Sequence, residues 1–324
     1  MQEKKMKSRF LNENFTYRYS SAILSYVVLA IILVISCLLD SNFFTLRNLK
    51  NILFTASPLM LVAFGQTLVV MTAGIDLSLG AVISVANVVC ASFMTESALG
   101  WLPAVLITLA VGAVCGLLNG MLVSYVKLPA IIVTLATAAV FEGCALLVMP
   151  VPGGSIHRGF GKFMKENISI FTFGFLIVLL VFAVMNLVMH KTSVGAKIKA
   201  IGENEGSAYS SGIRTKRVKI AVYTLAGTLS AAAGIFLATK MYSGDPTIGA
   251  NYTNNSVTAA VIGGTFLSGA VGDLSGTLAG AIIITLLDNI LNLVGVSTFW
   301  KFVLQGTVLI LALTLGSIQK IRRR

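Results

Sequence analysis

Four carboxylate side chains lie within or at the ends of long apolar runs: Asp76, Glu142, Asp273 and Asp288. An ionisable group in lipid is costly, so it usually faces an interior path or a paired site. Asp76 and Asp273 each precede Leu-Ser at an expected helix start, and for both we expect the structural role of an N-cap. Glu142 lies well inside its run, and two interpretations stay open: a hydrogen-bonded interior carboxyl without function, or a group that lines a path for a solute.

Amide and hydroxyl side chains are also frequent in the apolar runs. Asp288, followed by Asn289 and Asn292, gives one run a polar end. Such groups offer donors and acceptors to a neutral, hydroxyl-rich solute, but they also join helices to one another. As candidate path residues we select Asn87, Asn119, Thr137, Glu142, Asn255 and Asp288.

The sequence offers no recognisable catalytic set. It has no G-x-x-x-x-G-K-[ST] phosphate loop and no zinc motif, and its two histidines, His157 and His190, are too far apart for a ligand cluster or a Ser/His/Asp triad. All four cysteines lie inside apolar runs without C-x-x-C spacing, so small buried side chains explain them. We therefore expect no catalytic residue, no metal and no cofactor. Any ATP would have to be hydrolysed by a partner.

Composition identifies the environment that positions these residues. Of 324 residues, 56% are hydrophobic and 11% are charged, and the mean hydropathy is +0.89. Soluble domains carry about 25% charged residues, so the chain is expected to be an integral membrane protein of the all-α class. Its net charge of +12 lies mainly in the termini and loops that flank apolar runs, which argues against nucleic-acid binding.

The apolar runs predict about ten transmembrane helices. A hydrocarbon core of about 30 Å needs roughly 20 apolar residues of helix. The expected spans are 20–39, 52–72, 77–95, 102–126, 130–149, 168–190, 218–240, 250–268, 273–293 and 299–318.

The placement of Lys and Arg orients these helices, because cytoplasmic loops retain an excess of both. With both termini cytoplasmic, five lie in the N-terminal segment, one at Lys127, seven in the central segment and four at the C-terminus, which puts 17 inside and 7 outside. The outer loop 150–167 runs against the bias, with Arg158, Lys162 and Lys165. The expected organisation is a cytoplasmic N-terminal segment 1–19, a transmembrane domain 20–318 and a basic cytoplasmic tail 319–324.

Two glycine patterns predict close helix packing. Gly112, Gly116 and Gly120 recur every four residues, and Gly276 and Gly280 repeat this spacing later in the chain. Small residues at this spacing let the backbone of a neighbouring helix approach closely in lipid. We assign these glycines a structural role only.

Two segments look related to each other. GIDLSLGA at 74–81 and GDLSGTLAGA at 272–281 both place glycine and then D-L-S at a helix entrance. Internal repetition of this kind is common in transporters. The match is short, and it predicts a similar local structure at both places.

The longest polar interruption is the central segment 191–219, which carries seven of the 24 Lys and Arg residues. A basic cluster of this kind is retained in the cytoplasm. Within it, Glu203–Ser211 is long enough for about two helical turns, with Gly202 and Gly212 as expected boundaries. Two interpretations are open from the residues: a solvated connector, or a surface helix that contacts a cytosolic partner.

Six stretches match one known family in order. They are GQTLVVMTAGIDLSLGAV, LPAIIVTLATAAVFEG, GAKIKAIGENEGSAYSSGI, GDPTIGANY, AAVIGGTFLSGAVGDLSGTLAGAI and NLVGVSTFWKFVLQG, and they cover most of residues 50 to 310. On these stretches the sequence resembles the permease subunits of bacterial ATP-binding-cassette (ABC) importers for monosaccharides, the ribose, xylose and galactose permease family. Together, G-I-D-L-S, A-I-G-x-N and V-I-G-G-T-x-L-S-G are specific to it, and the first motif contains Gly74, Asp76 and Ser78.

The resemblance implies a multi-pass protein of the bacterial inner membrane. Its implied partners are an ABC ATPase subunit, an extracytoplasmic sugar-binding protein and a second permease, either another copy or a paralogue. It also favours the functional interpretation of the central segment, as the helix that couples the permease to the ATPase. The residues so assigned are Glu203, Asn204, Glu205, Gly206, Ser207, Ala208, Tyr209, Ser210, Ser211 and Gly212.

Departures from the family pattern leave the solute open. The family usually has Arg where Glu142, Ala196 and Val271 stand, and near Asn255 an acidic residue is frequent. The first expectation is the translocation path for a small sugar of the ribose type. The alternatives are a permease of the same architecture for a polyol, a furanone signal or a nucleoside, a stand-alone secondary transporter in which Glu142 carries protons, and a membrane scaffold.

Overall fold

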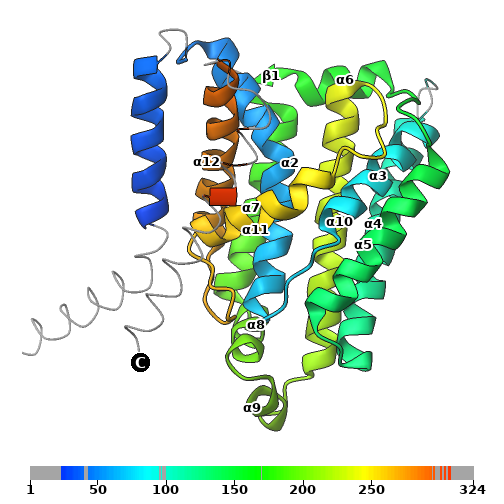
Figure 1. Ribbon diagram of the computed structural model, residues 1–324, viewed down its shortest axis with the longest axis vertical. Coiled ribbons are helices and arrows are strands. Elements are labelled where there is room, and N and C mark those ends of the chain that lie inside the picture. The colour runs from blue at the N-terminus through cyan, green and yellow to red at the C-terminus, as the bar shows by residue number, and fades with distance from the viewer. Residues whose placement is uncertain are drawn as a thin grey trace, which may run out of the picture.

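The computed structural model describes residues 23–39, 43–94, 96, 100–168, 170–293 and the single positions 295, 300, 303, 306 and 307. The described part is built almost entirely of helices (Figure 1). After a first helix, Ile23–Leu39, come α2 (Leu46–Met71), α3 (Leu79–Phe93), α4 (Trp101–Met121), a π-helical turn (Leu122–Val126), α5 (Ala130–Val148), α6 (Arg158–Lys165), β1 (Asn167–Ile168), β2 (Phe171–Thr172), α7 (Phe173–Lys191), α8 (Ser193–Glu203), α9 (Glu205–Ser210), α10 (Thr215–Met241), α11 (Ala250–Ile262) and α12 (Leu274–Leu293).

Six of the described helices are long and apolar enough to cross a membrane. They are α2, α4 with its π-helical turn, α5, α7, α10 and α12, and the helix Ile23–Leu39 and α3 are shorter apolar helices. The chain is therefore a helical, multi-pass membrane protein. The expected last span, 299–318, and both chain termini lie outside the described residues except at positions 300, 303, 306 and 307.

Three expected spans differ from the structure. The expected span 52–72 begins six residues earlier, at Leu46, where the Thr45 hydroxyl accepts the Asn48 N–H at 3.3 Å as an N-cap. The expected span 168–190 begins only at Phe173, because β1 and β2 pair with each other just before it and the Thr172 hydroxyl accepts the Phe175 N–H at 3.2 Å as an N-cap. The expected span 250–268 is too long, since α11 has 13 residues and ends at Ile262. In Figure 1 α11 runs obliquely across the bundle, which a hydropathy pattern does not reveal.

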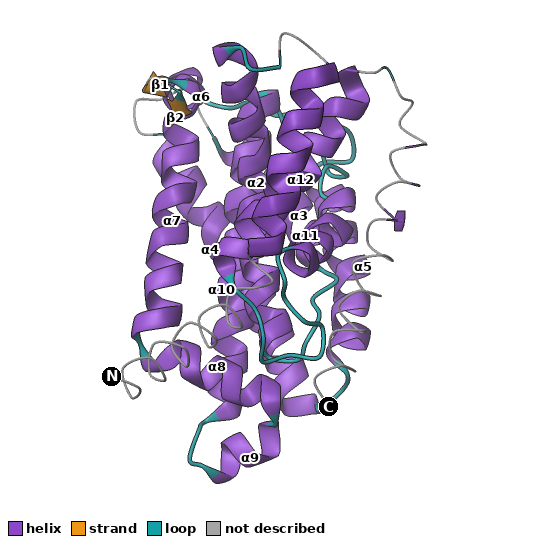
Figure 2. Ribbon diagram, turned by 90° about the vertical axis from the view of Figure 1, so that its left-hand side faces the viewer, coloured by secondary structure: helices purple, strands orange, loops and turns teal. Residues whose placement is uncertain are grey.

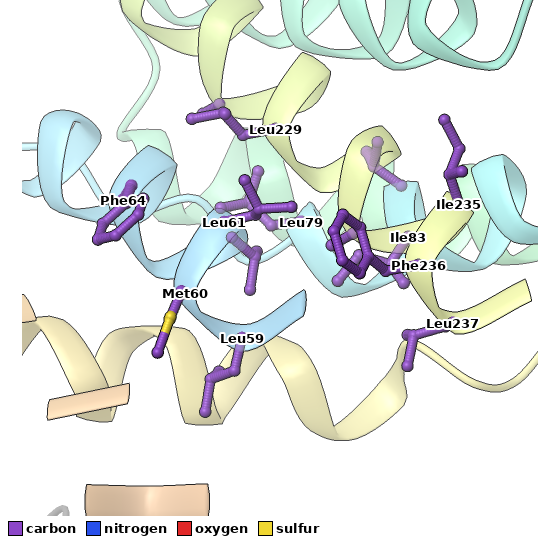
Figure 3. Close-up of a cluster of buried hydrophobic side chains, with 14 of the residues drawn as sticks. Leu59, Met60, Leu61, Phe64, Leu79, Ile83, Leu229, Ile235, Phe236 and Leu237 are labelled. Atoms are coloured by element: carbon purple, nitrogen blue, oxygen red, sulfur yellow. The ribbon is translucent and has the colours of Figure 1, made fainter. Parts of the chain in front are cut away.

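The core forms around α2 and α10. Both are largely buried, and they pack on each other and on α3. Large side chains from these three helices interlock in the centre of the molecule (Figure 3). The labelled residues are Leu59, Met60, Leu61, Phe64, Leu79, Ile83, Leu229, Ile235, Phe236 and Leu237.

The glycine stripe of α4 forms the contact with α10, as predicted. A Cβ added at Gly112 would lie 2.5 Å from the Gly227 carbonyl oxygen, and one added at Gly116 would lie 2.2 Å from that of Tyr223. Gly276 meets α11 in the same way, with the Gly263 carbonyl oxygen 1.9 Å from its added Cβ. The close approach of backbones explains why these positions need glycine.

The segments at the two ends of the bundle differ. α6 and the β1–β2 hairpin lie at one end, and α8 and α9 lie at the other (Figures 1 and 2). Loops 72–78 and 263–273 connect α2 to α3 and α11 to α12, and both reach toward the α8 end. The central basic segment and the loop 150–167 therefore lie at opposite ends of the bundle, as the expected order of spans requires.

Candidate functional site

The central segment contains two helices instead of one. α8 continues through Gly202 to Glu203, and Asn204 separates it from α9. The Asn204 side chain accepts the Ser207 N–H at 2.8 Å, so it is the N-cap of α9. The expectation that Gly202 begins the short helix is therefore wrong: the asparagine ends one helix and caps the next.

The expected end of the short helix at Gly212 is correct. Gly212 has φ +84°, its N–H binds the Tyr209 carbonyl at 2.9 Å, and the Ile213 N–H binds the Ala208 carbonyl at 3.1 Å. These two bonds make a Schellman motif, which requires a residue with positive φ and so favours glycine. The motif gives α9 a fixed end.

α9 projects from the bundle and presents one large side chain. Tyr209 is 72% exposed, whereas Ala208 is 4% exposed. Glu205 forms an ion pair with Lys219 of α10, which ties the start of α9 to the bundle. α9 is thus a short helix at one end of the bundle (Figure 2), anchored at its start and carrying an exposed aromatic ring.

Gly202 is the point where this end of the chain meets the transmembrane loops. A Cβ added there would lie 1.9 Å from the Met71 carbonyl oxygen and 2.4 Å from the Ala270 nitrogen. Met71 ends α2, and Ala270 lies in the loop between α11 and α12. Gly202 therefore permits close packing and does not terminate a helix.

The family motif forms a buried polar network at the start of α3. Asp76 Oδ1 accepts hydrogen bonds from the Ser78 N–H at 2.8 Å and from the Ser78 hydroxyl at 2.7 Å. Asn119 of α4 donates to the Ser78 hydroxyl oxygen at 2.7 Å. The expectation that Asp76 is an N-cap is wrong, since α3 begins at Leu79 and Ser78 occupies the position before it.

Threonines from two other helices hold the same entrance. Thr134 of α5 accepts the Leu77 N–H at 3.0 Å. Thr253 of α11 accepts the Gly80 N–H at 3.1 Å and donates to the Leu77 carbonyl at 3.4 Å. Backbone groups at the start of α3 are thus satisfied by side chains from α5 and α11.

Three polar atoms of this region are buried without a hydrogen-bond partner among the described residues: Asp76 Oδ2, Asn119 Oδ1 and the Tyr223 hydroxyl. Tyr223 lies beside Gly74, whose added Cβ would be 2.6 Å from the tyrosine hydroxyl. Gly74 therefore makes room for Tyr223 next to the Asp76 network.

The second motif shares two local features with the first. Asp273 accepts the Ser275 N–H at 3.3 Å and also binds the Ser275 hydroxyl, as Asp76 binds Ser78. Ala73 and Ala270, each three residues before its aspartate in the shared pattern A-x-x-D-L-S, have φ of 60° and 63°. The helix starts differ: α12 begins at Leu274, so the expected role of Asp273 as an N-cap is confirmed, whereas α3 begins three residues after Asp76.

The structure does not gather the six candidate path residues into one surface. Asn87 is buried and joins the Gly234 carbonyl, at 3.1 Å, to the Asp245 N–H, at 2.7 Å. This places it as a link between α3, α10 and the following loop. Asn119 belongs to the Asp76 network described above.

The other four candidates lie on α5, α11 and α12. On α5, Glu142 is exposed and Thr137 is half-buried. The two residues are five positions apart, so their side chains point about 140° apart around the helix. Asn255 on α11 is half-buried, and Asp288 on α12 lies close enough to Tyr252 of α11 to interact with it electrostatically. Glu142 is therefore an outward-facing residue of this chain.

At the opposite end, α6 carries a basic face. His157 caps it by accepting the Phe160 N–H at 3.1 Å, and Arg158 and Lys162 are exposed. Lys165 lies over the Tyr242 ring at 4.0 Å, and its pKa is lowered by burial and by the nearby charge of Lys240.

Sequence reasoning missed Thr253 and Tyr223 and did not select Thr134. Their signals are weak: Tyr223 is a tyrosine within an apolar run, and Thr253 stands in the polar stretch ANYTNNS. Nothing in either pattern identifies the start of α3 as the partner.

Comparisons with known proteins place the chain in a family. The family model of the branched-chain amino acid transport system permease component matches residues 48–313. The chain is 38% identical over 293 residues to the ribose import permease protein RbsC of Bacillus subtilis, covering 90% of this chain and 91% of that protein. RbsC of Escherichia coli K12 is 36% identical over 299 residues, covering 89% and 91%.

A galactose relative is also similar. The galactose/methyl galactoside import permease protein MglC of Escherichia coli K12 is 30% identical over 318 residues, covering 92% of this chain and 95% of that protein. No solved structure gives a significant match. The chain therefore belongs to this permease family, as a multi-pass membrane transport protein and not an enzyme.

Proposed function

We propose that the chain is the membrane-spanning subunit of an ABC importer in the bacterial inner membrane. It forms the translocation path for a small sugar of the ribose type, and a separate subunit hydrolyses ATP. The observation that carries this proposal is the 38% identity to a ribose import permease along 90% of the chain. We propose ten spans with both termini in the cytoplasm, on the distribution of Lys and Arg.

α9 is the proposed contact for the ATPase. It lies at the basic end of the bundle, it is capped at both ends, and it presents Tyr209 to solvent. Large aromatic side chains contribute most to many protein interfaces. Glu203–Gly212 therefore supplies the tip of the contact, with the bond between Glu205 and Lys219 holding it in place.

The exposed surface of α5 supports a second permease subunit as partner. α5 packs mainly on α3, and the apolar parts of α4, α5 and α7 are largely exposed. Among the exposed side chains of α5 is Glu142, and a carboxylate is disfavoured against lipid tails. We place Glu142 toward a path shared with a second copy or a paralogue, instead of toward lipid.

The basic face of α6 is the proposed contact for the sugar-binding protein. Arg158 and Lys162 are exposed at the end opposite α9. Opposite charges across an interface accelerate and orient association. A binding protein that docks here would present an acidic surface to these two residues.

The proposal is tested by reconstituting the permease with a candidate ABC ATPase and a candidate sugar-binding protein from the same genome. Proteoliposomes should take up labelled ribose only when ATP, both partners and the permease are present. An ATPase variant that binds ATP without hydrolysing it is the control, and galactose, a polyol and a nucleoside identify the solute. Uptake driven by a proton gradient without ATP would overturn the proposal in favour of a secondary transporter. ATP-driven uptake of galactose alone would overturn the ribose assignment, and ATP-driven uptake of the polyol or the nucleoside alone would overturn the sugar assignment.

A further inference from the structure

We propose that Gly202 transmits the position of α9 to both A-x-x-D-L-S loops, so that one contact links the ATPase-facing helix to the starts of α3 and α12. We name this contact the Gly202 junction; it consists of Gly202, Met71, Ala73, Gly269 and Ala270. The inference rests on the proposed function of α9 and adds the route by which α9 reaches the transmembrane helices.

The junction leaves no space for movement of one part without the others. A Cβ added at Gly202 would lie 1.9 Å from the Met71 carbonyl oxygen and 2.4 Å from the Ala270 nitrogen. A Cβ added at Gly269 would lie 2.7 Å from the Gly202 carbonyl oxygen and 2.9 Å from the Ala73 Cβ. Backbones in such contact transmit displacement, because close-packed interiors have low compressibility.

The two loops are also bonded to each other. The Ala270 N–H donates to the Met71 carbonyl at 3.0 Å, directly beside Gly202. Ala73 and Ala270 both have positive φ, at 60° and 63°, which is an unfavourable backbone conformation for alanine. The surrounding contacts hold this conformation in place in both loops.

The link from α9 to Gly202 is short and rigid. Only Asn204 separates α8 from α9, and its own N–H binds the Ala200 carbonyl at 3.1 Å while its side chain caps α9. Both helices are therefore fixed to one residue. A tilt of α9 moves the end of α8, where Gly202 lies.

Beyond the junction, each loop leads directly into a helix start that is bonded to its neighbours. Three residues after Ala73, Asp76 begins the network with Ser78, and Leu77 is held by threonines from α5 and α11. Three residues after Ala270, Asp273 caps α12. One turn further along α12, the Thr277 hydroxyl oxygen lies 2.7 Å from the Thr67 hydroxyl oxygen of α2. A displacement at Gly202 thus reaches α2, α3, α5, α11 and α12 through bonded groups.

The test uses the complete importer with Gly202→Ala, which adds one methyl group at the junction. The ATPase should co-purify as with the wild type, because α9 keeps its surface. ATP-driven uptake, and the stimulation of ATPase activity by the sugar-loaded binding protein, should fall at least about fivefold, the lower end of typical coupling between sites. The basal ATPase rate should stay unchanged.

Another glycine in the same segment provides a matched control. Gly195 of α8 is equally tight, with its added Cβ 1.9 Å from the Met189 carbonyl oxygen, but it contacts α7 and not the loops. Gly195→Ala should retain stimulated ATPase activity. An equal loss of stimulation in Gly195→Ala would overturn the junction, since it would show that any strain in α8 is sufficient.

If Gly202→Ala does not insert into the membrane, a second variant tests the Gly202 junction. This variant combines Ala73→Gly with Ala270→Gly. Glycine adopts the positive φ of both positions readily, and the change removes the Ala73 Cβ that lies beside Gly269. We expect assembly with the ATPase and the same loss of stimulated activity. Full stimulation in this double variant overturns the junction and leaves the proposed function intact. Failure of the wild-type complex to couple ATP hydrolysis to uptake overturns the proposed function itself.

Discussion

Ala208 and Tyr209 are adjacent on α9 and point about 100° apart around the helix, with 4% and 72% of their surfaces exposed. Tyr209 makes no large contact with its own bundle, so its removal should leave the fold intact. If α9 is the ATPase contact, Tyr209→Ala should weaken binding by roughly 2 kcal/mol, which is about thirtyfold in Kd. Co-purification of the ATPase and ATP-driven uptake measure the effect.

The matched control for Tyr209 is Ser210→Ala, an exposed neighbour with a small side chain. It should bind the ATPase as the wild type does. A charged residue at Ala208 is not a suitable test, because that position is buried and the change would disturb α9 directly. An intact Tyr209→Ala complex that still responds to the loaded binding protein would make this segment a connector only.

The α4–α10 contact should be sensitive to a single methyl group. At Gly116 an added Cβ would meet the Tyr223 carbonyl oxygen at 2.2 Å, so α4 must move outward in Gly116→Ala. Overpacking of this kind destabilises by about 1–3 kcal/mol. Gly143→Ala on α5 is the control, because nothing lies within 4 Å of its added Cβ. Thermal unfolding in detergent should separate the two variants, and equal stabilities would contradict the packing.

Sequence patterns predicted the features that depend on composition and regular spacing. Hydropathy located the apolar helices, and the four-residue spacing of Gly112, Gly116 and Gly120 identified a close helix contact that α10 supplies. Repetition of D-L-S correctly indicated the aspartate–serine hydrogen bond that both loops share, although the two helices begin at different distances from the aspartate. These properties are local, so no knowledge of the packing partner is needed to predict them.

Features that depend on a partner elsewhere in the chain were predicted less well. Gly202 was expected to be a helix boundary because glycine breaks helices, whereas it permits contact with Met71 and Ala270, far away in sequence. Asp76 was expected to cap a helix, but the helix begins two residues later than the local pattern indicates. For Glu142 the sequence left two interpretations open, because only packing determines which side of α5 faces outward.

The network at the start of α3 predicts the effect of losing one amide. Asn119 is buried and donates to the Ser78 hydroxyl at 2.7 Å. Asn119→Ala leaves the buried Ser78 hydroxyl with one hydrogen bond fewer. We therefore expect the free energy of unfolding to fall by about 1–3 kcal/mol. Asn254→Ala, at an exposed amide, is the control and should be close to neutral. Equal melting temperatures for both variants would show that the network contributes no stability.

Membrane topology can be tested at three positions. α6 and α9 lie at opposite ends of the bundle, so reporters within 153–161 and at Gly212 should report opposite sides of the membrane. A reporter at Arg324 should agree with the one at Gly212 if the chain has ten spans. Agreement between Arg324 and 153–161 would exclude the ten-span topology.

Glu142 provides the sharpest test of where the path lies. The side chain is exposed on α5 and is bordered by Gly143, beside which nothing lies within 4 Å, so the fold does not depend on it. Glu142→Gln keeps the size and removes the charge. If Glu142 faces the path or a second permease, this change should lower uptake at least about tenfold, equivalent to ~1.4 kcal/mol, with normal insertion and stability.

Comparison with Glu142→Leu separates the two environments that an exposed residue of a membrane helix can have. Against lipid, leucine is favoured over a carboxylate, so the variant should be at least as stable as the wild type and fully active. Against an aqueous path or a polar subunit contact, leucine should reduce uptake as strongly as glutamine does. Val140→Ala, at an exposed position about 160° away around α5, controls for general effects of changing this helix. Wild-type uptake in both Glu142 variants would place the residue outside the path and leave α5 with a structural role alone.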